Sequence, residues 1–175
     1  MDDESVTALR DDGIDRRPGC RPAPALLASP GVEGKQRLTA RGVDGMAMGA
    51  NHTRGDTVIW VEPDGVLFAG DIAMKGMPAF VSSRSSLNHW LDSLNRLDAL
   101  KPQVLVPSHG PLGDAGFIAG YRAYLTTVRT RVAALKAQGQ TLEQVTQTVT
   151  AELKGNYPDA GRLAGAIRVA LAEAR

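Results

Sequence analysis

A predicted β-hairpin in the middle of the chain is the feature that most restricts its fold. Residues 57–62 (Thr-Val-Ile-Trp-Val-Glu) are rich in β-branched and aromatic side chains, which favour extended structure. Pro63-Asp64-Gly65 supplies turn chemistry, and residues 66–69 (Val-Leu-Phe-Ala) read as a returning strand. A two-stranded ribbon is marginal by itself, so the rest of the chain has to supply neighbouring strands and an apolar layer.

Helical periodicity after the hairpin predicts that layer. Ser85 or Ser86 can cap a helix that Lys101-Pro102 ends. Its apolar side chains share one helical face: Leu87, Trp90, Leu91, Leu94 and Leu97. Residues 103–106 (Gln-Val-Leu-Val) are typical of a short buried strand.

Beyond residue 113 the pattern stays helical to the end of the sequence. Gly139 ends one helix, and Thr141 begins the next with a capping box completed by Gln144. A last helix is expected over about residues 159–174. The expected fold class is therefore α/β in the broad sense (α+β), with one β-sheet layered with helices.

The domain organisation follows from where these patterns begin. Residues 1–34 mix Asp, Arg, Gly and Pro without a sustained apolar period, and we expect a poorly ordered arm there. Short extended segments at residues 35–48 begin the main domain, which runs to residue 138. Residues 139–175 form a C-terminal helical extension that packs on the same domain.

Charge and cysteine content exclude several classes of protein. The 175 residues carry 20 Lys and Arg against 19 Asp and Glu, a net charge of +1, which argues against a nucleic-acid binder. The single cysteine, Cys20, excludes a disulfide framework. The acidic N-terminus and the lack of a long apolar run argue against a signal peptide or a membrane span, so the expected location is cytoplasmic.

Potential metal ligands lie in loops that follow predicted strands. These loops are residues 51–56, 69–71 and 107–111, and they contain His52, Asp71 and His109. Histidine nitrogen and carboxylate oxygen suit Zn²⁺, and also iron or manganese. Thr53 and Asp56 are expected to hydrogen-bond the backbone of the first loop and thereby to orient the His52 ring.

Three runs, His52-Thr53-Arg54-Gly55-Asp56-Thr57, Leu67-Phe68-Ala69-Gly70-Asp71 and Val106-Pro107-Ser108-His109-Gly110, resemble the second half of the metallo-β-lactamase superfamily. The resemblance covers about residues 35–138 and implies half of an αββα sandwich. It also implies that His52 binds one zinc ion, Asp71 bridges two ions and His109 binds the second. The implied activity is hydrolysis of an ester, lactone, thioester, amide or phosphoester by a metal-activated water, with no side chain assigned as catalytic.

The chain departs from this family in one respect. The family's His-x-His-x-Asp-His loop should precede His52, but residues 1–51 contain no histidine, so the ligands of that loop are absent. The alternative function is therefore a catalytically inactive remnant that forms a homodimer or binds a partner. With the second sheet missing, strands near Val58, Trp60, Val66 and Phe68 are expected to be uncovered, which favours self-association, a covering partner chain or an N-terminal arm folded over the face. The remaining histidine, His89, is expected to be solvated on its helix.

Overall fold

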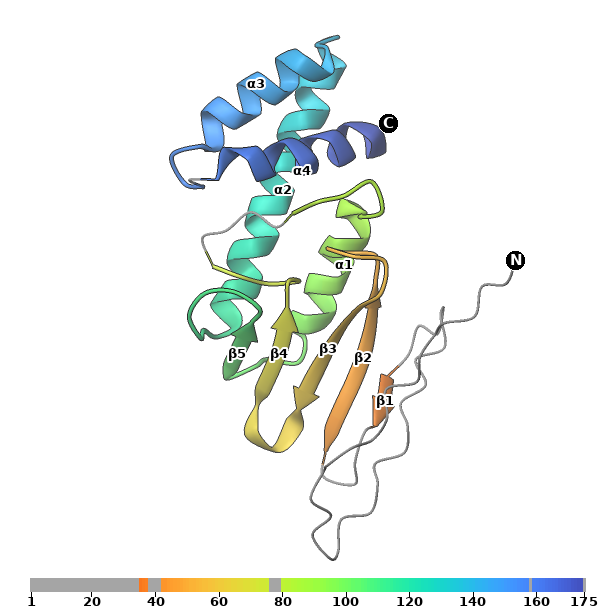
Figure 1. Ribbon diagram of the computed structural model, residues 1–175, viewed down its shortest axis with the longest axis vertical. Coiled ribbons are helices and arrows are strands. Elements are labelled where there is room, and N and C mark those ends of the chain that lie inside the picture. Colours follow the sequence, from red (N-terminus) through yellow and green to blue (C-terminus); the bar gives the residue numbers. More distant parts are fainter. Residues whose placement is uncertain (1–34, 38–41, 76–79, 158, 175) are drawn as a thin grey trace, which may run out of the picture.

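The computed structural model describes residues 35–37, 42–75, 80–157 and 159–174 (Figure 1). The predicted arm, residues 1–34, lies outside this range. The described residues contain these strands: β1 (Lys35–Arg37), β2 (Val43–Gly49), β3 (Asp56–Val61), β4 (Val66–Gly70) and β5 (Val104–Pro107). They contain these helices: η1 (Glu62–Asp64), α1 (Leu87–Asp98), α2 (Ala115–Ala137), α3 (Leu142–Leu153) and α4 (Ala160–Glu173).

The strands form one mixed sheet in the order β1-β2-β3-β4-β5. Neighbours from β1 to β4 are antiparallel, and β5 is parallel to β4 because the connection between them crosses over through α1. At the outer edge of β5, Leu105 and Gly113 exchange backbone hydrogen bonds of 2.7 and 2.9 Å. The loop after β5 thus folds back on its own strand.

The predicted hairpin is confirmed as β3 and β4, joined by the short turn η1. Gly65 ends this turn with φ of 60°, a left-handed conformation that favours glycine. A Cβ at Gly65 would also lie 3.1 Å from Cγ of Gln103. The Gly65 carbonyl accepts hydrogen bonds from the Gln103 and Val104 amides, at 2.9 and 3.1 Å, so the turn holds the start of β5 in place.

The helix boundaries follow the expected caps. Ser86 caps α1, with its hydroxyl accepting a 3.2 Å hydrogen bond from the His89 amide. The capping box of α3 is confirmed, since Thr141 and Gln144 bond each other's backbone amides reciprocally. Helix α4 begins after Asp159, as the pattern predicted.

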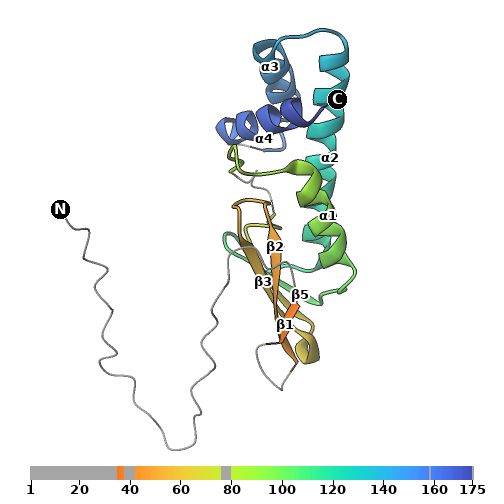
Figure 2. The same cartoon turned by 90° about the vertical axis from the view of Figure 1, so that its right-hand side faces the viewer.

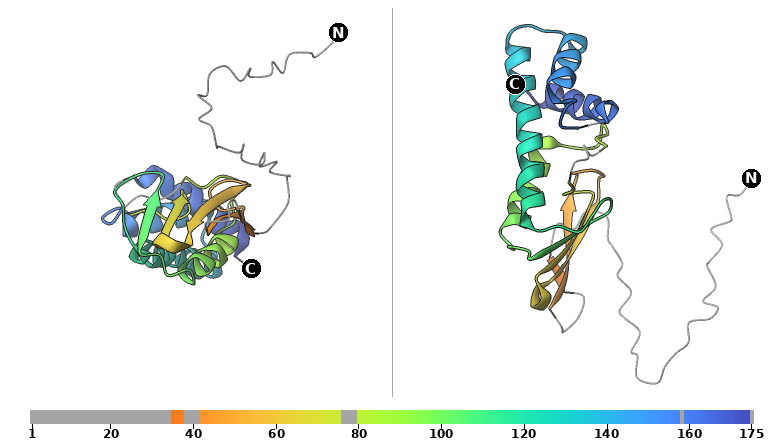
Figure 3. Two further views of the ribbon diagram at one scale, coloured as in Figure 1. Left: turned by 90° about the horizontal axis from the view of Figure 1, so that it is seen from below. Right: turned by 90° about the vertical axis from the view of Figure 1, so that its left-hand side faces the viewer.

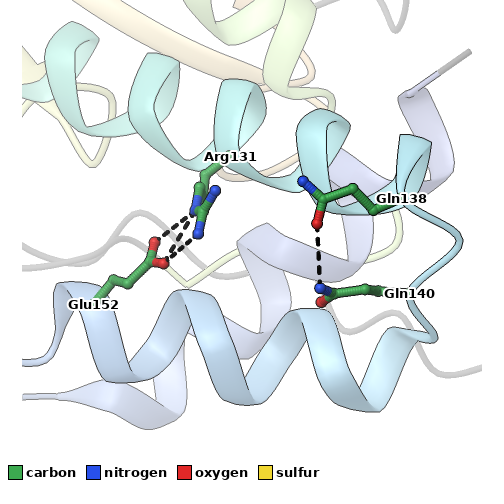
Figure 4. Close-up of polar contacts among 4 residues, drawn as sticks. All are labelled: Arg131, Gln138, Gln140 and Glu152. Atoms are coloured by element: carbon green, nitrogen blue, oxygen red, sulfur yellow. Dashed lines mark hydrogen bonds and ion pairs between the residues drawn. The ribbon is translucent and has the colours of Figure 1, made fainter.

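The helices gather on one side of the sheet and extend past its end (Figures 2 and 3). Helices α1 and α2 cover the sheet, whereas α3 and α4 pack on the far half of α2. Between α2 and α3, Arg131 donates bidentate hydrogen bonds of 2.6–3.0 Å to the Glu152 carboxylate (Figure 4). These bonds lower the pKa of the Glu152 carboxyl. Near the helix ends, the Gln140 side-chain amide donates a hydrogen bond to the Gln138 side-chain oxygen. None of the described helices is long and apolar enough to cross a bilayer.

The two faces of the sheet differ in exposure. Val58 and Trp60 point toward the helices and are 0% and 7% exposed, so the expectation that they would be uncovered was wrong. Successive side chains of a strand alternate between faces, and the helices cover the face that holds Val58 and Trp60. On the other face, Ile59 is 39% and Phe68 is 44% exposed, and these two residues are register partners. We call this side of the sheet the open face.

The expectation for His89 was also wrong. His89 is half-buried, and its Nε2 donates a 2.6 Å hydrogen bond to the Met48 carbonyl at the end of β2. Gly49 lies under the ring, since a Cβ there would stand 2.7 Å from the same nitrogen. Helical periodicity identified a polar face but carried no information about the strand end that meets it.

Candidate metal centre

The loops with the predicted ligands all lie at the same end of the sheet, where the strands begin or end. Residues Gly49 and Asp56 pair where β2 ends and β3 begins, and Gly70 pairs with Pro107 where β4 and β5 both end. Since β3 is antiparallel to β4, all these positions lie at the same end of the strands, and we call this end of the sheet the rim. The sheet therefore carries His52, Asp71 and His109 on loops of the same rim.

Asp56 organises the first loop. Its carboxylate accepts hydrogen bonds from the Thr53 amide at 3.0 and 3.1 Å, the Thr53 hydroxyl at 2.6 Å and the Asn51 amide at 3.2 Å. These bonds close the backbone around His52, whose carbonyl accepts a 3.2 Å bond from the Ser85 hydroxyl. Thr53 and Asp56 thus bond the loop as the sequence suggested, and their effect on a ligand stays a prediction.

The ring of His52 is oriented by a backbone carbonyl. Its Nδ1 lies 2.7 Å from the Phe80 carbonyl oxygen, and the two rings meet edge to face with centroids 6.4 Å apart. Because a carbonyl oxygen only accepts, Nδ1 carries the hydrogen and a neutral ring keeps its lone pair on Nε2. A metal-binding histidine is commonly fixed in this way by a carbonyl on its other nitrogen.

Asp71 and His109 meet at the neighbouring part of the rim. Asp71 Oδ1 lies 3.7 Å from His109 Nε2 and accepts a 2.7 Å hydrogen bond from the Ser108 hydroxyl. The Asp71 side chain is 30% exposed and the His109 side chain 61% exposed. The pair therefore faces solvent, within reach of a small molecule.

The backbone explains why these two side chains converge. The parallel strands β4 and β5 end side by side, and the Ser108 amide donates a 3.0 Å hydrogen bond to the Gly70 carbonyl. Gly70, at the end of β4, and Gly110, in the loop after β5, have φ of 56° and 93°, so the chain turns sharply at each glycine. Asp71 and His109 are the neighbours of these glycines in the two loops.

The structure does not bring His52 into the Asp71–His109 pair. No group of three or more His, Cys, Asp or Glu side chains that could hold an ion occurs among the described residues. A catalytic zinc site uses three protein ligands and an open position, so the pair supplies suitable donors but is one ligand short. The assignment of all three residues to a metal stays a prediction.

Sequence reasoning gave no role to two groups that the structure places at these loops. Ser108 bonds Asp71 directly, and the Phe80 carbonyl orients the His52 ring. Ser108 could have been found, because it precedes His109 in the loop after a strand whose neighbour ends at Asp71. Phe80 lies 28 residues from His52 in a segment without strong local periodicity, and nothing in the sequence linked the two.

A pocket of about 580 Å³ opens between the start of α2, the loop after β4 and the segment before α4. Met74 forms part of its wall and also connects it to the pair, since the Met74 sulfur lies 3.6 Å from the Ser108 hydroxyl. Aromatic side chains from α2 and Tyr157 line much of the rest, together with Lys75, Asp114, Asn156 and two glycines. We call this cavity the aromatic pocket.

Tyr124 is the most perturbed titratable group in the pocket wall. The residue is 3% exposed, and its hydroxyl has no hydrogen-bond partner among the described residues. Burial, and to a lesser degree the neighbouring Tyr157, raise the pKa of the Tyr124 hydroxyl far above its ordinary value. Tyr124 therefore stays protonated and keeps a donor hydrogen at every physiological pH.

Comparison with known proteins supports the family resemblance. The sequence profile described as the metallo-beta-lactamase superfamily matches residues 7–109, more than half of the chain. The chain belongs to the metallo-β-lactamase superfamily. The matched range begins within residues 1–34, ahead of the part that the structure describes, and ends on His109.

Solved structures that match part of this chain include metallo-β-lactamases. The crystal structures of VMB-1 and DIM-1 are each 20% identical to this chain and have TM-scores of 0.47. The metallo-β-lactamase from Pontibacter korlensis is 22% identical, with a TM-score of 0.44. These matches cover 51–53% of this chain and 42–45% of the other chains, so the aligned part is less than half of each solved structure. A search of curated proteins found no match.

Proposed function

We propose that this chain is a metal-dependent hydrolase of the metallo-β-lactamase superfamily that acts on an ester, lactone, thioester, amide or phosphoester. The supporting observation is the pairing of Asp71 and His109, with 3.7 Å between donor atoms, at the rim that also carries His52. A mixed nitrogen and oxygen donor set suits zinc, and iron or manganese as well.

His52 is the third ligand in this proposal. Its Nε2 lone pair is available because the Phe80 carbonyl holds the hydrogen on Nδ1. Bringing that nitrogen to the pair requires the loop around Asp56 to shift, and Thr53, Arg54 and Gly55 of this loop are exposed. A bound zinc ion would supply a water of lowered pKa as the nucleophile.

The residues of the chain itself have two roles in this proposal. The Ser108 hydroxyl holds one carboxylate oxygen of Asp71, which fixes the rotation of that side chain. Asp56 closes the His52 loop through four hydrogen bonds to its carboxylate. The Ser108 bond reduces the freedom that the Asp71 side chain loses when it binds an ion.

Zinc binding to the purified chain tests the proposal. We expect about one ion per chain by isothermal titration calorimetry, and an affinity at least about 10-fold lower in His52→Ala, Asp71→Asn and His109→Ala. Asp92→Asn, an exposed carboxylate on α1, is the matched control and should bind zinc as the unaltered chain does. Zinc binding that none of the three substitutions changes would rule the proposal out.

A second candidate function is supported by the open face. Ile59 and Phe68 lie side by side on it, and the adjoining side chains from register pairs are Val61, Val66, Val104 and Val106. Exposed apolar area of this kind normally marks an interface. We propose that a second copy of this chain covers the face, with the two sheets packed against each other as a homodimer.

Sedimentation equilibrium tests the dimer. Phe68→Lys should raise the dissociation constant at least about 10-fold, because a lysine there would bury an unpaired charge in the interface. Leu112→Lys is the control, since Leu112 is 66% exposed on the loop after β5 and should leave association unchanged. A monomer at all concentrations would instead mean that this face is covered within one chain or by another protein.

A further inference from the structure

We propose that the aromatic pocket binds an uncharged aryl or acyl group that carries an acceptor oxygen. The evidence for this binding comes from the pocket residues and does not depend on the hydrolase function. Identifying the group as part of the substrate rests on the hydrolase function proposed above. The pocket and the Asp71–His109 pair are linked by two contacts. Met74, which lines the pocket, contacts the Ser108 hydroxyl, and that hydroxyl donates a hydrogen bond to Asp71.

Helix α2 leaves open space for the ligand at Gly120. Gly116, Gly120 and Tyr124 follow one another at four-residue intervals, so they share a face of the helix, and all three line the pocket. A Cβ built at Gly120 would meet no atom within 4 Å. The space beside this helix turn is therefore open, and a larger side chain there would enter the pocket rather than clash with the protein.

Aromatic rings form the apolar walls. Phe117 and Tyr121 lie on α2 next to the glycines, and Tyr157 contributes from the segment before α4. Tyr124 contacts both tyrosines, with ring centroids 5.7 Å from Tyr121 and 4.6 Å from Tyr157. A flat ring or an alkyl chain fits such walls, since both gain from dispersion and from the release of water.

The charges in the pocket wall favour a neutral ligand. Lys75 and Asp114 are exposed, oppositely charged residues of the lining. The Asp114 carboxylate already caps α2 by accepting a 2.7 Å hydrogen bond from the Gly116 amide. One cation and one anion give no net attraction for a charged molecule, so affinity has to come from the apolar body.

Tyr124 adds a polar requirement, beside the Asn156 amide that also lines the pocket. Its hydroxyl oxygen is closed to solvent and its hydrogen has no acceptor in the described part of the chain, so a ligand oxygen reaches it only when the ring turns toward the pocket. An unsatisfied buried donor is costly, and a ligand oxygen that accepts its hydrogen removes that cost. The favoured ligand therefore combines an apolar body with a carbonyl or similar acceptor.

Titrations of the full chain with two uncharged ketones, 4-phenyl-2-butanone and 2-octanone, test this proposal without any metal or turnover. Nitrogen–proton NMR spectra should show shifts centred on residues 114–124, with a dissociation constant of about 1 mM or lower. The carboxylate 4-phenylbutyrate should bind more weakly than the phenyl ketone. The two ketones also show whether the pocket prefers a ring or a chain.

Two substitutions localise the binding. Gly120→Leu should raise the dissociation constant at least about 10-fold by filling the pocket, and the better helix former should keep the fold intact. Its control, Ala119→Leu, alters the exposed neighbour on the same helix and should change affinity less than about 2-fold. Tyr124→Phe should weaken ketone binding by about 3- to 10-fold.

Ketone binding that survives Gly120→Leu, or no binding up to the solubility limit, would overturn the proposal. Tighter binding of the carboxylate would overturn the neutral-ligand part. Because these measurements need neither zinc nor hydrolysis, their outcome is separate from that of the zinc titration. Binding without zinc affinity would leave a ligand-binding protein, whereas zinc affinity without binding would leave the hydrolase without this substrate class.

Discussion

At the scale of single residues, the sequence predicted which side chains could bind a metal better than it predicted their hydrogen-bond partners. His52, Asp71 and His109 were chosen from their loops, and Asp71 and His109 do meet at 3.7 Å. The hydrogen bonds of His52 to the Phe80 carbonyl and of His89 to the Met48 carbonyl could not be foreseen. Both depend on segments far apart in sequence, where local periodicity carries no information.

Tyr124 gives a prediction about alkaline stability. Its raised pKa means that an unfolded chain, with an ordinary value near 10, loses this proton first as the pH rises, so the free energy of unfolding falls above about pH 10. Urea denaturation should show the unaltered chain losing about 1–2 kcal/mol more than Tyr124→Phe between about pH 9 and pH 11.5.

At neutral pH the same substitution should be neutral or should stabilise the chain by up to about 1 kcal/mol, because it removes an unpaired buried hydroxyl. A clear loss of stability in Tyr124→Phe would show that the hydroxyl has a partner outside the described residues. Equal losses at high pH in both proteins would contradict the assigned pKa direction.

At the scale of elements, caps and turns were the most predictable parts. The hairpin, the Ser86 cap and the Thr141–Gln144 capping box were all expected from local chemistry, and all are present. The parallel pairing of β5 with β4 was not foreseen, although it brings Asp71 and His109 together. Strand neighbours depend on tertiary packing, which residues 103–106 alone do not reveal.

The turn at Gly65 permits a matched pair of glycine substitutions. Gly65→Ala should lower the free energy of unfolding by about 1–2 kcal/mol, because φ is 60° there and a Cβ would crowd Gln103. Gly120→Ala, in a helix with open space, should raise it by about 0.5–1 kcal/mol. Urea denaturation of both variants measures the difference, and equal effects would contradict the geometry described for the turn.

At the scale of the whole molecule, a helical layer covers one side of a sheet and leaves Ile59 and Phe68 exposed on the other. The sequence predicted an uncovered side and assigned Val58 and Trp60 to it together with Val66 and Phe68, since strand alternation shows that two faces exist and not which one the helices choose. Zinc binding and dimer formation test different parts of this arrangement and can succeed independently.

The backbone bonds between Leu105 and Gly113 also limit how copies of the chain can assemble. An exposed strand border normally recruits further strands and can grow without limit into fibrils. Here the backbone groups of Leu105 in β5 already bond Gly113 of the following loop, so a strand of another chain cannot pair along the full outer edge of β5. In the proposed homodimer, contact through the open face would close on itself instead and would yield a particle of finite size.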